Sequence, residues 1–160
     1  MIKEVSGDIL LTKARVIAHG IAPNDHFNAG LAHELREQWP AMYQDFRHYC
    51  HAEHPKPGET WIWAGTEGKR IVNMFTQEAP LNHQGNPGRA NTHNVNQALR
   101  QLRQIIEKEE FESLALPRLA TGVGGLDWDE VLPLIKKHLG DLKIPIYLYT
   151  NYQKGKPAEE

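Results

Sequence analysis

The stretch 114–128 constrains the fold more than any other part of the chain, because it joins a short apolar run to a cluster of glycines. Residues 114–116 predict a buried strand. Gly122, Gly124 and Gly125 then predict a tight loop whose main chain can come close to a ligand. The stretch therefore indicates a strand, a glycine loop and a helix start in succession.

The residues after this loop favour the beginning of a helix. Asp127 is expected to cap that helix, with Glu130 at capping-box spacing. A glycine loop that leads into a helix points backbone N–H groups at one spot, which suits a phosphate or diphosphate. The alternative is a glycine-rich surface turn. The dinucleotide-binding Gly-x-Gly-x-x-Gly and the lysine-bearing P-loop are both absent from the stretch.

The rest of the chain alternates between strand and helix patterns. Short apolar runs predict strands at 1–6, 16–20, 61–64, 70–75, 114–116 and 144–149. Apolar residues at helical spacing predict helices near Leu31–Trp39, Met42–Cys50, Val95–Ile106 and Trp128–Leu139. We expect the strands at 61–64 and 70–75 to form a hairpin. This alternation predicts an α/β protein.

Prolines and polar runs mark the expected breaks. Pro40 is expected to stop the first helix, and Pro133 should make the last helix start late or kink. The polar loop 76–89 is long enough to be functional or mobile, and 153–160 is expected to fray as a polar tail.

Length, charge and cysteine usage limit the class of protein. The chain has 160 residues, which favours one domain, and a formal net charge of −2. A phosphate-bearing ligand would then be held by local amides rather than by a basic surface. Cys50 is the only cysteine, and the sequence has no long apolar run and no secretion-signal layout at its start. We therefore expect a cytoplasmic protein, acting as a monomer, with no membrane partner.

Four segments together resemble a macrodomain, the ADP-ribose-binding family. They are Gly7-Asp8-Ile9, the loop 19–30 with its Asn28-Ala29-Gly30-Leu31 end, the strand 71–75, and Pro117–Trp128. Their order and spacing cover essentially the whole chain. The similarity is greatest to the branch that includes DNA- and glutamate-linked ADP-ribose hydrolases. The resemblance implies a three-layer α/β/α sandwich with a mixed central sheet, formed by a single macrodomain at 1–152 and followed by the tail 153–160.

The resemblance also implies ligand-binding roles. Asp8 would accept a hydrogen bond from the adenine amine, with the Ile9 amide beside it; the alternative is that Asp8 caps a turn. Around the rest of the ligand, the implied contacts are Asn28, Ala29, Gly30 and Leu31 at the distal ribose, Thr121, Gly122, Val123, Gly124 and Gly125 at the diphosphate, Phe75 at the end of its strand, and Tyr149 with Asn151 or Tyr152 at the adenine. Each of these segments has an alternative as an ordinary loop, helix entry or strand end.

The sequence departs from the hydrolase pattern at the positions that are expected to carry the chemistry. Gln77 stands where hydrolases of this branch carry a catalytic lysine, and Gly124 stands where some relatives carry an acidic residue. Gln cannot act as an amine nucleophile. Asp25 and His26 lie in the loop expected to meet the distal ribose, and both residue types do acid–base chemistry. The alternative for this pair is a solvated loop.

Three functions remain open. The first is an enzyme that removes ADP-ribose from a protein or nucleic-acid adduct or processes an ADP-ribose derivative. The second is a non-catalytic reader of ADP-ribose, which Gln77 favours. The third is binding of an unrelated nucleotide. We expect no cofactor and no metal, because His48, Cys50, His51 and His54 run from a helix into a proline-containing loop and read as a solvated polar face.

Overall fold

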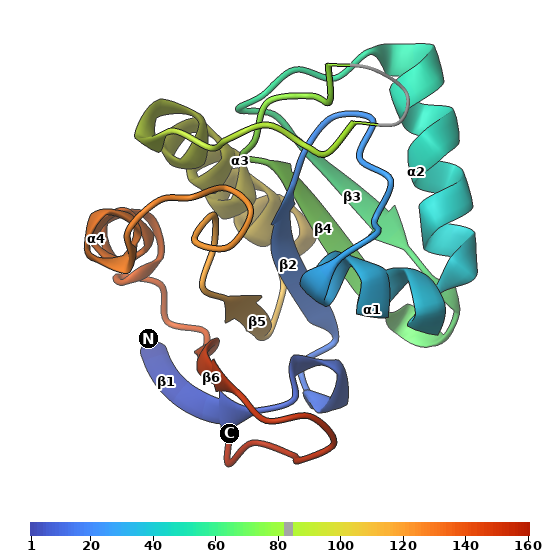
Figure 1. Ribbon diagram of the computed structural model, residues 1–160. Helices are drawn as coiled ribbons and strands as arrows, with labels where there is room; N and C mark the ends of the chain where they lie inside the picture. The colour runs from blue at the N-terminus through green and yellow to red at the C-terminus, as the bar shows by residue number, and fades with distance from the viewer. Residues whose placement is uncertain (82–84) are drawn as a thin grey trace.

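The computed structural model describes residues 1–81 and 85–160, and a six-stranded sheet forms its middle layer (Figure 1). The strands are β1 (Ile2–Gly7), β2 (Val16–Ile21), β3 (Thr60–Ala64), β4 (Arg70–Phe75), β5 (Leu114–Pro117) and β6 (Ile146–Tyr152). Their order is β1-β6-β5-β2-β4-β3. All neighbours are parallel except β3 and β4, which form the predicted hairpin. The sheet is therefore mixed, as expected.

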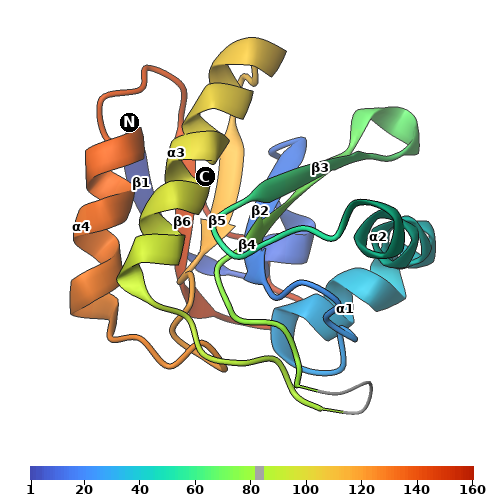
Figure 2. The same cartoon turned by 90° about the horizontal axis from the view of Figure 1, so that it is seen from above.

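Helices cover both faces of the sheet, which confirms the three-layer α/β/α sandwich (Figure 2). They are α1 (Gly30–Gln38), α2 (Pro40–Glu53), α3 (Thr92–Glu109) and α4 (Trp128–Leu139), with short 3-10 turns η1 (Ile9–Leu11) and η2 (Thr66–Gly68). Side chains alternate between the faces along each strand. In β2, Ile17 and Ile21 pack toward α1 and α2, whereas Val16 and Ala18 join the core beneath α3 and α4.

The structure corrects one expectation about element ends and refines two others. Asp127 occupies the N-cap position of α4, but its side chain accepts no capping hydrogen bond; its main-chain carbonyl accepts from Glu130 N at 2.9 Å instead. The helix α4 runs through Pro133 from Trp128, so it does not start late. Pro40 begins α2 rather than only ending α1, because proline fits the first helical position, where no N–H is needed.

The last segment is also different from its expectation. Residues 153–160 do not fray: they turn back and pack beside β1, where Ala158 joins the core on the α1–α2 side of the sheet. A polar segment can dock in this way because its main chain and the Glu160 carboxylate both make hydrogen bonds to the rest of the chain. Whether 1–152 forms a domain without this segment stays a prediction.

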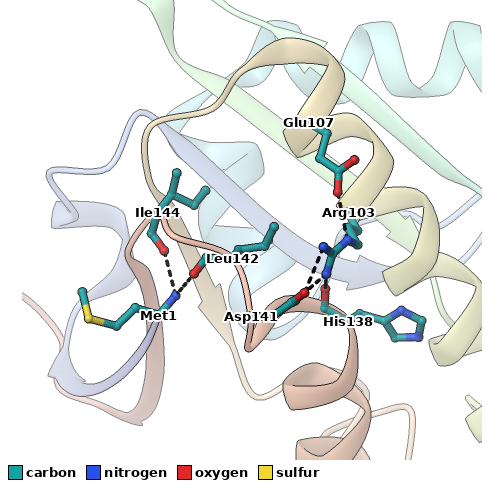
Figure 3. A network of polar contacts seen from close by, with 7 residues as sticks. All are labelled: Met1, Arg103, Glu107, His138, Asp141, Leu142 and Ile144. Atoms are coloured by element: carbon teal, nitrogen blue, oxygen red, sulfur yellow. Dashed lines mark hydrogen bonds and ion pairs between the residues drawn. The ribbon is translucent and has the colours of Figure 1, made fainter.

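A polar network holds the outer helices together at the end of the sheet away from the carboxyl ends of its parallel strands (Figure 3). Arg103 of α3 forms ion pairs with Glu107 and Asp141 and donates to the His138 carbonyl at 2.7 Å. The Met1 ammonium donates to the Leu142 carbonyl and, at 3.0 Å, to the Ile144 carbonyl. Because these groups are largely exposed, the ion pairs add only modestly to stability.

None of the helices in the described residues has both the length and the apolar character that crossing a membrane requires.

Candidate ligand-binding cleft

A cleft of about 650 Å³ opens at the carboxyl ends of β2, β5 and β6. This is the edge of an open α/β sheet at which ligands bind. One wall is the glycine loop and the other is the segment that leads into α1. The lining residues are His19–Ile21, Asp25, His26, Asn28–Ala32, Gln77, Gly85–Pro87, Pro117–Gly124, Tyr149, Thr150 and Tyr152. The structure thus brings together most of the site residues expected from the sequence.

Several amides of the glycine loop have no main-chain acceptor among the described residues. Gly125 N donates to Gly122 O at 3.1 Å and Leu126 N to Ala120 O at 3.0 Å, which closes the loop on itself. Within the described residues, the amides of 121–124 donate to no backbone acceptor. These four residues line the cleft, so their N–H groups are available to an anion.

Two glycines of this loop serve different purposes. A Cβ at Gly124 would lie 2.7 Å from the Ala120 carbonyl oxygen, so this position needs glycine for the loop to close. A Cβ at Gly122 would meet nothing within 4 Å. A side chain at Gly122, which lines the cleft, would therefore not disturb the loop.

The opposite wall ends in the N-terminus of α1. Ala29 is the N-cap residue and provides no side-chain cap, so the first amides of the helix are left for another acceptor. Ala29, Gly30, Leu31 and Ala32 all line the cleft. The positive end of the helix dipole thus faces the same space as the glycine loop.

The loop before α1 is held in shape by Asp25. Its carboxylate accepts hydrogen bonds from Phe27 N at 2.8 Å and from Ala22 N at 3.3 Å. Burial raises the pKa of the Asp25 carboxyl, although these two hydrogen bonds and His26 act in the opposite direction. The arrangement makes Asp25 an organiser of the loop as well as a lining residue.

His26 is the more accessible of the two acid–base candidates. Its backbone is fixed because Arg36 donates to the His26 carbonyl at 3.0 Å, and its side chain is half-buried. Asp25 and His26 also line a second hollow of about 430 Å³ on the α2 side of the loop, together with Arg47, His51 and other residues of α2. His26 thus stands between two spaces that could hold the two sides of a bond to be cleaved.

A buried histidine forms part of the cleft floor. His19 Nε2 lies 2.7 Å from Asn73 Oδ1, across the ladder between β2 and β4. Burial lowers the pKa of His19 to about 4, against a smaller upward effect of the Asn73 hydrogen bond. His19 is therefore neutral at pH 7, with one ring nitrogen protonated and the other an acceptor.

Gln77 has a structural partner in the position where a lysine was expected. Its Nε2 donates to the Gly88 carbonyl at 3.0 Å, and its main chain forms an isolated bridge with Ala90. Ala90 N in turn donates to Gly124 O at 3.0 Å. Gln77 therefore fastens the far end of the loop 76–89 against the glycine loop while it lines the cleft.

The end of the cleft near β6 differs from the expectation. Asp8 and Ile9 are buried outside the cleft lining, and both Asp8 carboxylate oxygens already accept backbone hydrogen bonds, from Leu10 N at 3.0 Å and from Gly155 N at 2.9 Å. The turn-cap alternative for Asp8 is thus observed, and its adenine role stays a prediction. Tyr149 does line the cleft, and burial together with its hydrogen bond to Glu160 raises the pKa of its hydroxyl.

Three further expected residues do not line the cleft. Phe75 is fully buried and stacks on Phe46 with ring centroids 5.9 Å apart, so it supports the cleft from beneath. Its place in β4 explains this, because Phe75 shares a face with Ile71 and both pack toward α2. Asn151 lies in the ladder between β6 and β1, and Gly125 lies beside the Arg89 side chain.

The sequence reasoning missed some lining residues that lie within motifs it used. Arg118 is exposed at the cleft, with its guanidinium carbon 5.4 Å from the centre of the Trp128 ring. It offers a cation to a phosphate although the net charge of the chain is −2. Arg118 lies inside the stretch 117–128, and this position could have identified it as a lining residue. Among the described residues, no group of three His, Cys, Asp or Glu side chains is placed to hold a metal ion.

Comparison with known proteins gives consistent results. The family model described as Macro domain matches residues 22–135. A DNA ADP-ribosyl transferase-DNA ADP-ribosyl glycohydrolase fusion protein from Thermosipho africanus is 26% identical over 96% of this chain. The match spans only 42% of that protein, so the chain has less than half of its length.

Two solved structures show the same fold. The macrodomain of Thermus aquaticus DarG has a TM-score of 0.81 at 22% identity, covering 94% of this chain and 98% of that chain. Thermosipho africanus DarTG in complex with ADP-ribose has a TM-score of 0.81 at 21% identity, covering 97% of this chain and 42% of that one.

Proposed function

The chain belongs to the Macro domain family, and we propose that its cleft binds ADP-ribose and releases it from a nucleic-acid adduct. The observation that carries this proposal is the pair of facing amide sources, the loop 121–124 and the N-terminus of α1, in one cleft. The diphosphate of ADP-ribose matches them, because it needs several hydrogen-bond donors within a short distance. The nucleic-acid adduct is suggested by the name of the Thermosipho africanus relative.

The diphosphate would lie between the two walls. The amides of 121–124 would donate from one side and those of Ala29 to Ala32 from the other, with Arg118 supplying charge at the entrance. The distal ribose would then be directed toward His26, and the adenosine toward Tyr149 and Tyr152. This orientation leaves the second hollow, on the far side of His26, for the group attached to ADP-ribose.

Hydrolysis in this cleft would break the bond between the anomeric carbon and the adduct. The carbon gains oxocarbenium character, and the bound diphosphate stabilises it electrostatically. His26 would assist by moving a proton, either to the leaving group or from the attacking water. Water adds to the anomeric carbon and the adduct leaves with a proton. Asp25 would keep His26 in place through the loop that it organises.

A second candidate function, a reader without turnover, is favoured by one observation. Gln77 is bonded to Gly88 and provides no nucleophile where hydrolases of this branch carry a lysine. A reader would still bind ADP-ribose in this cleft, because Gln77 does not itself belong to the amide set of 121–124 and α1.

The deciding experiment is release of ADP-ribose from an oligonucleotide that carries it on one base, beside a protein carrying it on glutamate. We expect release from the oligonucleotide at least about 100-fold above a blank without protein, the usual scale of one acid–base group. Tight binding with no release from either substrate would identify a reader.

Gln77→Lys distinguishes the two functions further, with Gln77→Met as its control. Gln77→Met removes the donor to the Gly88 carbonyl, and only lysine adds an amine. Activity that appears with lysine alone in an inert parent would show a reader that lacks only the nucleophile. Equal activity of the parent and both variants would support a mechanism without lysine.

We also propose that the protein acts as a monomer in the cytoplasm, which its single, buried cysteine supports. Light scattering on the purified protein would test the oligomeric state, and fractionation of the source cells would test the location.

A further inference from the structure

The second hollow, between the loop before α1 and the helix α2, has a floor and a rim of different character. Its floor includes Phe46 and Cys50, which are buried in the core on this side of the sheet. Its rim carries three exposed, nitrogen-bearing side chains, which are Arg47, His51 and His54. The hollow of about 430 Å³ therefore combines an apolar base with hydrogen-bond donors at its edge.

The rim residues follow one another along α2. Arg47 and His51 are four residues apart in the helix, and side chains at this spacing lie on the same face. His54, the C-cap residue of α2, comes three residues after His51 and also lines the hollow. An extended ligand that runs along α2 would therefore meet the three side chains in succession.

Arg47 is positioned at the rim and keeps donors free. Its Nη1 donates to the Tyr43 hydroxyl at 3.1 Å, and its guanidinium carbon lies 5.9 Å from the centre of the Tyr43 ring. Among residues 1–81 and 85–160, no carboxylate forms an ion pair with Arg47. A guanidinium carries more N–H groups than this one contact uses. Arg47 is therefore a positioned cation that can bind a phosphate.

Asp25 is the only acidic residue among the described residues that line this hollow. It is 6% exposed, and its carboxylate accepts hydrogen bonds from Ala22 N and Phe27 N. The exposed ionic charge of the lining is therefore the positive charge of Arg47, although the net charge of the chain is −2. This local charge favours an anionic ligand.

The hollow and the cleft share a wall that is formed by Asp25 and His26. A group bonded to the anomeric carbon of a ribose at this wall would extend past His26 into the hollow. When that group is a nucleotide in a strand, its neighbouring phosphodiesters enter the same space. A strand presents a phosphate at every nucleotide, whereas a peptide presents carboxylates only where its sequence has them. The row of rim residues therefore fits a strand better than a peptide.

We propose that the second hollow is a phosphodiester site, which takes the nucleic-acid strand that carries the ADP-ribosylated nucleotide. Arg47 binds a phosphate beside that nucleotide, and His51 and His54 donate further hydrogen bonds to the strand. The site makes the protein prefer an adduct within a strand over the same adduct on a free nucleoside. This inference rests on the proposed function, which places ADP-ribose in the cleft.

The test compares two substrates that carry the same adduct, a short strand with ADP-ribose on its central base and the corresponding free nucleoside. Half-saturation is measured in single-turnover release, or by calorimetry if the parent protein binds without release. The parent should be half-saturated by the strand at about 10-fold lower concentration, the equivalent of one charge-assisted hydrogen bond. DNA and RNA strands in parallel arms distinguish the two sources of the phosphodiester.

Arg47→Gln removes the cation and should raise the half-saturating concentration of the strand by about 10-fold, with less than about 2-fold change for the nucleoside. The slope of log affinity against log salt concentration should fall by about 1 for the strand. Arg47→Lys keeps the charge and should retain most of the salt dependence.

Arg100→Gln is the matched control. It removes the same charge from an exposed arginine of α3, which covers the opposite face of the sheet from α2 (Figure 2). Half-saturation by the strand should stay within about 2-fold of the parent value in this variant. Circular dichroism checks that each variant is folded.

The outcomes separate this inference from the proposed function. Equal half-saturation by strand and nucleoside in the parent, or equal losses in Arg47→Gln and Arg100→Gln, would overturn the inference and leave ADP-ribose binding intact. A peptide with ADP-ribose on glutamate that depends on Arg47 as strongly as the strand would also overturn it. A parent protein that does not bind free ADP-ribose in calorimetry would overturn the proposed function and the inference together. A preference for the strand that is lost in Arg47→Gln alone would support both.

Discussion

The two ends of the cleft are prepared for a ligand to different degrees. At the phosphate end, the amides of 121–124 donate to no backbone acceptor within the described residues, the N-terminus of α1 has no side-chain cap, and both segments line the same cleft. At the base end, the hydrogen-bonding groups of Asp8 and Tyr149 are already engaged, by Gly155, Lys156 and Glu160. The phosphate end therefore offers amides without partners, whereas the polar groups of the base end already have partners within the chain.

This difference indicates where binding energy comes from. A preorganised set of amides gains its full hydrogen bonds on binding, because no protein contact has to break first. At the base end, the Asp8 carboxylate already accepts two backbone hydrogen bonds, so a ligand donor would share its remaining acceptor positions. We therefore expect most of the affinity to come from the phosphate end.

The largest expected effect is at the phosphate end. Gly122→Glu places a carboxylate in the open space of the cleft, and two like charges about 4 Å apart repel by about 4 kcal/mol at a surface-like dielectric. We expect ADP-ribose affinity to fall by several hundred-fold, measured by calorimetry. Gly122→Gln is the uncharged control and should lose about 10-fold or less. Equal losses in both variants would mean that bulk, not charge, blocks the cleft.

The next effect concerns the wall that carries His26. His26→Ala should lower turnover by about 100- to 1,000-fold, since one acid–base group is lost. The dissociation constant of ADP-ribose should change by less than about 3-fold, because the phosphate contacts lie elsewhere. Single-turnover kinetics on an ADP-ribosylated oligonucleotide would measure the first quantity. An unchanged rate would remove His26 from the mechanism and leave the substrate or another group to do the chemistry.

Asp25→Asn is the companion to that variant and separates chemistry from loop order. Asparagine keeps one acceptor oxygen, so only one of the two backbone hydrogen bonds is lost. We expect a loss of about 1 kcal/mol in unfolding free energy, measured by urea denaturation. A fall in turnover as large as that of His26→Ala, with unchanged stability, would assign Asp25 a direct role.

The buried His19 should make the free energy of unfolding depend on pH. The pKa of His19 is lowered from 6.5 to about 4 in the folded protein, so the unfolded chain binds this proton more readily. The stability is therefore complete above pH 6.5 and is lost as the pH falls to 4, by about 3 kcal/mol in total. Denaturation of His19→Gln should lack this part of the pH slope. An identical slope in both proteins would show that His19 is not kept neutral.

The smallest expected effect on affinity is at the base end. Asp8→Ala leaves the Leu10 and Gly155 amides without their acceptor, which should cost about 1–3 kcal/mol in unfolding free energy. ADP-ribose affinity should change by less than about 3-fold if Asp8 only caps the turn through these two backbone hydrogen bonds. A loss of affinity above 10-fold with unchanged stability would mean that Asp8 reads the base in the resting protein.

The phosphate end could be predicted from sequence because its signal is local. The glycines of 122–125 and the apolar run before them lie in one stretch, and parallel strands place such loops at one edge of the sheet. Side chains alternate between the two faces along β4, so the sequence could have predicted that Phe75 packs on the same side as Ile71. The family resemblance alone assigned Phe75 to the ligand. The family resemblance supplied the identity of the ligand, which the residue pattern could not.

The base end could not be predicted for a physical reason. The contacts between β1 and 153–160 are made largely by the amides of Asp8 and Gly155 and by carbonyls such as that of Lys156. Every residue has these groups, so no side-chain pattern reveals their pairing. The sequence predicts a polar tail because only two side chains attach the segment, the apolar Ala158 and the side-chain carboxylate of Glu160. The hydrogen bond from Gln77 to the Gly88 carbonyl could not be predicted for the same reason, since its acceptor is a main-chain group.

The pairing of β1 with β6 has a consequence for how the protein is made. Within this domain, the strand made earliest pairs with the one made latest, since Ile2 lies opposite Ile146, and β6 is the only neighbour of β1 in the sheet of the described residues. At about 5–20 residues per second, β1 waits roughly 7–30 s for its partner. The nascent chain must keep an apolar strand unpaired for that time. Closing so long a loop is slow, so we expect the β1 edge to complete the sheet last, after the central strands have assembled.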